Sequence, residues 1–138
     1  TYHNADALPL LRPLVRPGTI VLTLQNGVSS PNDVGRMVGA DHVLAGPTYI
    51  ATAVRAPGLI EQTGTHRRIV FGEVTQTGPE PSARVRELAA LFTSADIQAE
   101  PVADARVPLW EKLTYLAPFA AVTGAARQPA GVVWSTPA

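Results

Sequence analysis

The spacing of apolar side chains predicts four helices along this chain. They begin near residues 4, 29, 82 and 104, each close to a Ser, Asn or Asp whose side chain can cap a helix. The third helix is the most regular, with apolar residues at Val85, Leu88, Ala89, Leu91 and Phe92. Pro118 lies inside the fourth and predicts either a kink or a division into two helices.

Short apolar and β-branched runs between these helices predict strands. Residues 19–24 and 42–52 are two such runs, and the first is so uniformly apolar that it suits a parallel strand buried on both faces. Residues 59–63 and 68–72 are separated by a short loop, so we expect them to form a β-hairpin with each other. Glu73 follows directly and is expected to be a solvated carboxylate at a strand end.

The order of these elements points to the fold class. Helices and strands alternate up to an extended segment at residues 97–102, and no strand signal follows it. Such alternation favours an α/β sheet followed by a helical segment. We therefore expect residues 1–103 to belong to a sheet-containing domain and residues 104–138 to a helical one.

Composition excludes several classes of function. The net charge is zero and no basic stripe runs along the chain, so a nucleic-acid partner is not expected. Cysteine is absent, and the three histidines lack the spacing of metal ligands, so neither a disulfide nor a metal site is predicted. No apolar run has the length of a membrane span, and a cytoplasmic location without a membrane partner is the expectation.

Lysine occurs once in this sequence, at Lys112, against ten arginines. A lysine ammonium can lose its proton when buried and so serve as a general acid or base, whereas arginine effectively cannot. Lys112 lies near the start of the fourth predicted helix and is the best catalytic candidate in the chain. The alternative is an ordinary surface lysine in an arginine-rich protein.

A second candidate follows the first predicted strand, where Gln25, Asn26 and Gly27 end the apolar run. Ligands of open α/β sheets bind at the carboxyl ends of the strands. There the Asn26 amide can bond a cofactor or a carbonyl oxygen, and Gly27 lets the backbone approach closely. Asn-Gly is also a common turn dipeptide, so a turn without a ligand is the other interpretation. The sequence contains no GxGxxG phosphate loop, P-loop or Ser-His-Asp order.

Three separated segments, taken in order, resemble the ketopantoate reductases (2-dehydropantoate 2-reductases). They are TIVLTLQNGV at 19–28, GPTYIATAVRAPGLIEQTGTHRRIVFGE at 46–73, and LWEKL at 109–113, which runs into AVTGA at 121–125. The resemblance implies the later part of a Rossmann-type domain followed by the first helices of an all-α C-terminal domain. It also implies NADPH-dependent reduction of a 2-oxo acid, the ketopantoate step of pantothenate biosynthesis. The family's GxGxxG turn is then expected upstream of this chain, and the rest of the helical domain downstream.

The resemblance assigns roles to individual residues. Lys112 matches the catalytic lysine, which donates a proton to the ketone oxygen while NADPH delivers hydride to the carbon. Asn26 matches the asparagine that contacts the nicotinamide and the substrate, and Gly27 lies beside it in the expected cofactor site. Thr52 falls where the family often has an alanine that contacts the cofactor.

The chain departs from the family at residues that hold the substrate. Leu116 and Ala120 stand one and two turns after Lys112, where the family has asparagines, and Ala130 falls at a further asparagine position. Losing three amides disfavours ketopantoate and favours a more apolar 2-oxo acid as the small-molecule partner. The alternative is a truncated, non-catalytic relative that acts as a scaffold, and the chain is in either case a possible homodimer.

Overall fold

Five strands form one mixed sheet in the part of the chain that this computed structural model describes, residues 3–75 and 78–135. They are β1 (Val21–Thr23), β2 (Val43–Ala45), β3 (Thr48–Ala56), β4 (Leu59–Glu73) and β5 (Gln98–Asp104). The order across the sheet is β1-β2-β4-β3, and β5 pairs with the carboxyl-terminal part of β4. β1 is parallel to β2 and β5 is parallel to β4, whereas β4 is antiparallel to β2 and β3. The carboxyl ends of β1 and β2 therefore meet at one edge of the sheet.

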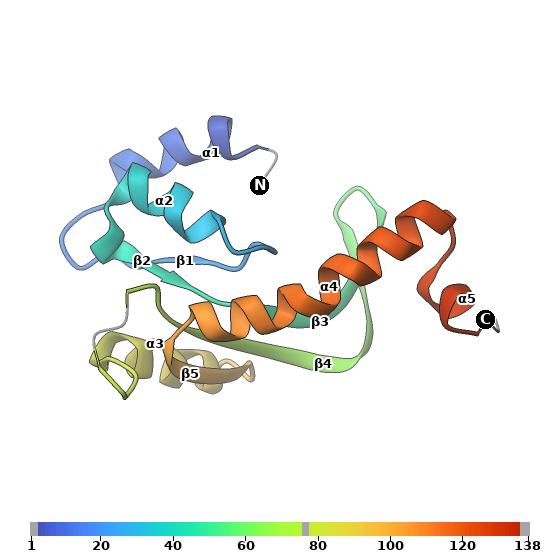
Figure 1. The fold of residues 1–138 in the computed structure, drawn as a ribbon. Helices are drawn as coiled ribbons and strands as arrows, with labels where there is room; N and C mark the ends of the chain where they lie inside the picture. The colour runs from blue at the N-terminus through green and yellow to red at the C-terminus, as the bar shows by residue number, and fades with distance from the viewer. Residues whose placement is uncertain (1–2, 76–77, 136–138) are drawn as a thin grey trace.

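Helices cover both faces of the sheet (Figure 1). They are α1 (Asn4–Leu11), α2 (Ser30–Val38), α3 (Ala83–Ser94), α4 (Arg106–Ala126) and α5 (Ala130–Ser135). Adjacent residues of a strand point to opposite faces, and β2 shows which helix lies on each. Val43 packs with Val34 of α2, whereas Leu44 packs with Val85 of α3. The expected α/β fold class is confirmed.

The predicted hairpin between residues 59–63 and 68–72 is wrong. Both segments belong to the single strand β4, and the hairpin is formed by β3 and β4 around Pro57 and Gly58. Gly58 has a φ of 77°, which glycine adopts without strain. The residues expected to form a loop are instead an irregular stretch of β4, because the pairing with β3 shifts there and resumes beyond it.

α4 is an unbroken helix of 21 residues that contains Pro118, so division into two helices is excluded. It runs from the end of β5 toward the far end of the β3–β4 hairpin (Figure 1). α5 follows as a separate short helix that begins at Ala130. Among the described residues, no helix combines the length and the apolar character that a membrane crossing requires.

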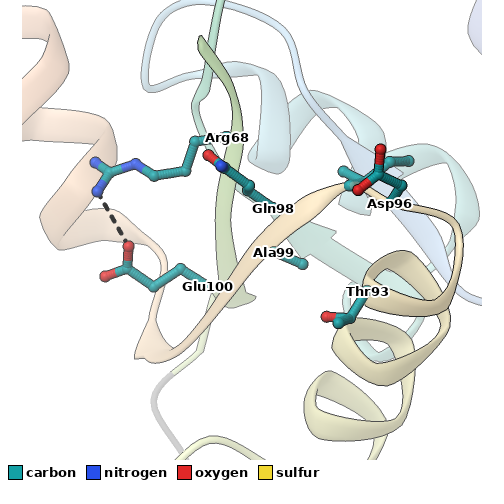
Figure 2. Close-up of a pocket in the computed structure, with 7 residues that line it drawn as sticks. Arg68, Thr93, Asp96, Gln98, Ala99 and Glu100 are labelled. Carbon is teal, nitrogen blue, oxygen red and sulfur yellow. Dashed lines mark hydrogen bonds and ion pairs between the residues drawn. The ribbon is translucent and has the colours of Figure 1, made fainter. Parts of the chain in front are cut away.

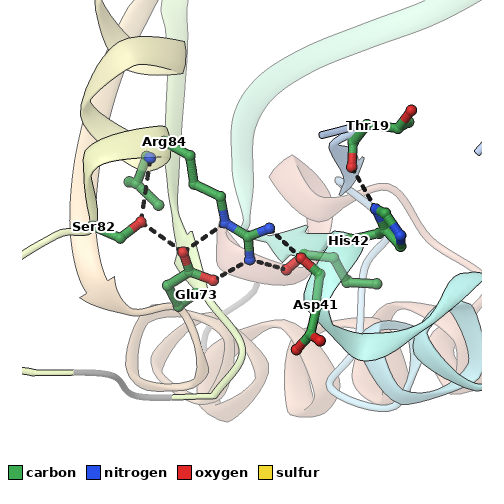
Figure 3. Close-up of polar contacts among 8 residues, drawn as sticks. Thr19, Asp41, His42, Glu73, Ser82 and Arg84 are labelled. Atoms are coloured by element: carbon green, nitrogen blue, oxygen red, sulfur yellow. Dashed lines mark hydrogen bonds and ion pairs between the residues drawn. The ribbon is translucent and has the colours of Figure 1, made fainter. Parts of the chain in front are cut away.

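Glu73 ends β4 as a carboxylate that is only 6% exposed, so the expectation of a solvated side chain is wrong. It accepts hydrogen bonds from Ser82 Oγ at 2.6 Å and Arg84 Nε at 2.8 Å, and Arg84 also reaches the Asp41 carbonyl (Figure 3). The bond from Arg84 holds the pKa of Glu73 below its ordinary value. Ser82 Oγ also accepts the Val85 amide, which confirms the predicted cap of α3.

Candidate active site

Lys112 and Asn26 lie 86 positions apart in the sequence and are joined by a hydrogen bond. Lys112 Nζ donates to Asn26 Oδ1 at 2.8 Å and to the Thr48 carbonyl at 2.7 Å. Asn26 lies beyond the carboxyl end of β1, and Thr48 begins β3 directly after β2. The ammonium therefore lies at the sheet edge where ligands of α/β folds bind.

The first turn of α4 is anchored to the sheet, and this directs the Lys112 side chain toward the sheet edge. The Ala105 amide donates to the Glu73 carbonyl at 2.8 Å, which places the first turn of α4 beside the end of β4. Ala105 and Leu109 are buried against Ala45 of β2. Lys112 follows Leu109 by three residues, so both occupy the side of the helix that faces the sheet.

Partial burial lowers the pKa of the Lys112 ammonium from its ordinary 10.5. An ammonium has three N–H donors, and two of them are used by Asn26 and Thr48. The third N–H can reach a further acceptor in the neighbouring pocket. A lysine that is held at two points and has a lowered pKa is suited to bond a carbonyl oxygen and to give up a proton to it.

The pocket beside Lys112 has a volume of about 630 Å³. Polar groups line it near the sheet edge, and apolar groups come from β3 and α4. Its lining residues are Asn26, Thr48, Tyr49, Ile50, Ala51, Thr63, His66, Arg68, Gln98, Lys112, Tyr115 and Leu116. The Tyr49 ring lies close to two cations, because Lys112 Nζ is 5.5 Å and Arg68 Cζ is 4.6 Å from its centroid.

Of the residues that the sequence singled out, Asn26, Lys112 and Leu116 line this pocket together. Leu116 is partly buried one turn beyond Lys112, where its side chain adds apolar surface. Thr52 lies on the exposed part of β3, and Ala120 is exposed a further turn along α4. Neither contributes to the lining of this pocket.

One further predicted residue lies outside this pocket, and two residues that were not predicted line it. Gly27 has a φ of 98°, so its conformation favours glycine, but it does not line the pocket. His66 and Arg68 line the pocket although neither was predicted to belong to a site. His66 was assigned to the loop of the predicted hairpin, and Arg68 to its second strand. Recognising β4 as one strand with alternating faces would have directed both side chains to the same side.

Another, smaller pocket of about 350 Å³ lies between β5 and the end of α3 (Figure 2). It shares Arg68 with the pocket beside Lys112. In Figure 2 the Arg68 side chain extends toward α4 and away from Asp96 and Thr93, and it bonds Glu100 at 3.2 Å. Within residues 3–75 and 78–135, no group of three His, Asp or Glu side chains is arranged to hold a metal ion.

Comparison with known proteins identifies similar sequences and structures. The sequence profile of the family described as ketopantoate reductase PanE/ApbA matches residues 1–76. The 2-dehydropantoate 2-reductase of Halobacterium salinarum is 33% identical over 98 residues, which are 70% of this chain and 30% of that protein.

Crystal structures of two 2-dehydropantoate 2-reductases are also similar. The protein from Geobacter metallireducens GS-15 superposes with a TM-score of 0.86 at 30% identity, over 98% of this chain and 44% of that one. The protein from Porphyromonas gingivalis W83 gives 0.83 at 25% identity, over 96% and 45%. The expected Rossmann-type fold class is confirmed. The chain spans less than half the length of each of these relatives.

Proposed function

The chain belongs to the ketopantoate reductase family, and from that premise we propose that it supplies the catalytic lysine of an NADPH-dependent 2-oxo acid reductase. The observation that carries this proposal is the ammonium of Lys112, held by Asn26 and the Thr48 carbonyl at the mouth of a pocket. Residues 1–103 are then the later part of the dinucleotide-binding domain. Residues 104–138 begin the helical substrate domain.

The residues at this edge of the sheet fit the nicotinamide end of such a cofactor. The pocket opens beyond the carboxyl ends of the parallel strands β1 and β2, where dinucleotides bind in Rossmann-type folds. Asn26 offers an amide at that position, and Gly27 leaves the backbone uncovered because no side chain extends from it. The cofactor, when bound, supplies a hydride for the ketone carbon.

Lys112 provides the other half of the reaction. Its third N–H donates to the ketone oxygen, which becomes negative as the carbon is reduced, and the proton then passes to that oxygen. Asn26 and Thr48 keep the ammonium in one position, so little reorganisation accompanies the transfer. The product is a 2-hydroxy acid, and Lys112 takes its proton back from solvent.

Leu116 and its neighbours favour an apolar substrate side chain. Ile50 and Leu116 give the pocket apolar surface, and Leu116 stands where related enzymes are expected to carry an amide. A hydroxyl on the substrate has no amide partner at Leu116, and a lost hydrogen bond of this kind is worth about 0.5–1.5 kcal/mol. We therefore propose an apolar 2-oxo acid in place of ketopantoate.

The test is NADPH oxidation by the complete gene product with ketopantoate and a series of apolar 2-oxo acids. We expect turnover of an apolar acid, with a kcat/KM about tenfold or more above that for ketopantoate. Lys112→Met should lower kcat by about a hundredfold to ten-thousandfold, because both the charge and the proton are lost. Turnover that survives Lys112→Met would refute the assignment. Absence of both NADPH binding and turnover in the wild type would favour the non-catalytic alternative.

A further inference from the structure

Arg68 is a second cation in the pocket beside Lys112, and the proposed reaction gives it no role so far. Its guanidinium carbon lies 4.6 Å from the Tyr49 ring centroid, and Lys112 Nζ lies 5.5 Å from the same point. The two cations are therefore no more than about 10 Å apart, with one aromatic ring beside both.

A 2-oxo acid presents two oxygen-bearing groups on adjacent carbons, a ketone and a carboxylate. If Lys112 bonds the ketone oxygen, the carboxylate needs a donor of its own, preferably one with positive charge. Among the described residues that line the pocket, Arg68 is the side chain besides Lys112 that carries a permanent positive charge. A guanidinium also matches a carboxylate with two parallel hydrogen bonds.

The upper limit on the distance between the cations leaves room for such a substrate. A ketone oxygen and a carboxylate on adjacent carbons, with a hydrogen bond of about 3 Å at each end, fit within the limit that the Tyr49 ring sets. Arg68 extends from β4 toward α4, the helix that carries Lys112 (Figure 2). Both charged residues therefore line one pocket and can contact one small molecule in it.

Glu100 already pairs with Arg68 at 3.2 Å, and a substrate carboxylate has to compete with it. The side chains of Arg68 and Glu100 are 47% and 53% exposed, so water screens their attraction and the pair is easily exchanged. An incoming carboxylate can share the guanidinium, which has five N–H donors, or displace Glu100 from it.

We propose that Arg68 binds the carboxylate of the 2-oxo acid and so fixes the ketone against Lys112. Arg68 is in this view a substrate-binding residue, and Glu100 is a competitor that weakens binding of anionic substrates. The inference rests on the proposed function for the identity of the substrate. It goes beyond that function by naming a residue of β4 as the group that binds the substrate carboxylate.

The adjacent residue provides a matched control. Arg67 is also on β4 and also pairs with an exposed carboxylate, since its Nη2 lies 3.8 Å from Asp96 Oδ2. It does not line the pocket beside Lys112. Arg67→Gln and Arg68→Gln therefore remove the same charge from neighbouring positions, and only the second should alter carboxylate binding.

Two measurements on the complete protein test the inference. The first is binding of oxalate, a non-reducible carboxylate pair, by calorimetry in the presence of NADP⁺. The second is the KM for an apolar 2-oxo acid and for its uncharged methyl ester. We expect Arg68→Gln to weaken oxalate binding and to raise the KM of the acid by about tenfold to a hundredfold. The KM of the ester should stay within about twofold, and Glu100→Gln should lower the KM of the acid.

Each outcome decides between the inference and its failure. Equal effects of Arg68→Gln and Arg67→Gln, or equal effects on acid and ester, would overturn it, as would a wild type that does not bind oxalate. If the wild type shows no turnover but binds oxalate, and Arg68→Gln abolishes that binding, then the carboxylate site is supported and the proposed function fails. If turnover depends on Lys112 but Arg68→Gln leaves the KM of the acid unchanged, then the proposed function is supported and the inference is overturned.

Discussion

Replacing Gly46 by alanine should destabilise the protein and disturb the candidate site together. An alanine Cβ at this position would overlap the carbonyl oxygen of Val70 and come within 2.6 Å of Phe71 Cα. Both neighbours belong to the backbone of β4, and Phe71 is fully buried. Relief by rotation of a flexible side chain is therefore excluded, and the backbone itself must move.

The magnitude follows from the hydrogen bonds that hold this segment. The Gly46 amide donates to the Thr23 carbonyl at 3.2 Å, and the Val70 amide donates to the Pro47 carbonyl at 3.1 Å. A shift large enough to remove the overlap weakens at least one of these bonds, worth about 1 kcal/mol. Overpacking of a tight core adds roughly 1–3 kcal/mol. We expect a loss of about 3 kcal/mol in the free energy of unfolding.

Urea unfolding of the complete protein measures this loss, and Gly124→Ala is the control. Gly124 lies inside α4 with no neighbouring atom within 4 Å of an added Cβ, so that change should be neutral or stabilising by up to about 1 kcal/mol. Thr48, whose carbonyl accepts a hydrogen bond from Lys112 Nζ, lies two residues after Gly46. A shift of this segment moves that carbonyl, so Gly46→Ala should also lower kcat. A Gly46→Ala protein within about 1 kcal/mol of the wild type would refute the reasoning.

Three further variants follow from the same geometry. Arg84 lowers the pKa of Glu73 in the folded state, so this pair stabilises the protein above pH 4.5 and loses that contribution as the pH falls through the lowered value. The stability gap between wild type and Glu73→Gln should accordingly close in acid, which pH-dependent urea unfolding measures. Asn26→Asp places a carboxylate beside the Lys112 ammonium and should raise the pKa of Lys112. The alkaline limb of the kcat/KM profile should then move up by about 1–2 pH units. A limb that stays in place would contradict the contact between Asn26 and Lys112. Leu116→Asn returns an amide to the pocket and should shift the kcat/KM ratio toward ketopantoate by roughly tenfold, whereas an unchanged ratio would exclude Leu116 from substrate selection.

Local signals predicted much of the fold. Ser82 followed by a regular apolar spacing predicted the cap of α3 correctly, because a cap depends on residues within one turn. The uniformly apolar residues 19–24 predicted the parallel strand β1 correctly, but not its burial on both faces, since Val21 and Leu22 are only half-buried. Lys112 was singled out because its chemistry differs from that of arginine.

Features that depend on distant contacts were not accessible from local patterns. Glu73 reads as a strand-end carboxylate, and its burial depends on Arg84, which comes from the next helix. The hydrogen bond between Asn26 and Lys112 joins residues 86 positions apart in the sequence, and composition does not indicate which distant residues come into contact. Arg68 was missed because the strand that carries it was divided in two by a loop that is really an irregular stretch of β4.

The central claim is that the Lys112 ammonium donates the proton during reduction of the ketone. The most direct test is the pH dependence of kcat/KM for the complete protein and for Lys112→Arg, which keeps the charge but is too weak an acid to give up its proton. Since burial lowers the pKa of Lys112, we expect wild-type activity to fall with rising pH through an apparent pKa below 10.5. Lys112→Arg should lack this limb and be at least about a hundredfold slower throughout. Wild-type turnover in Lys112→Arg, with the same alkaline limb, would contradict the account.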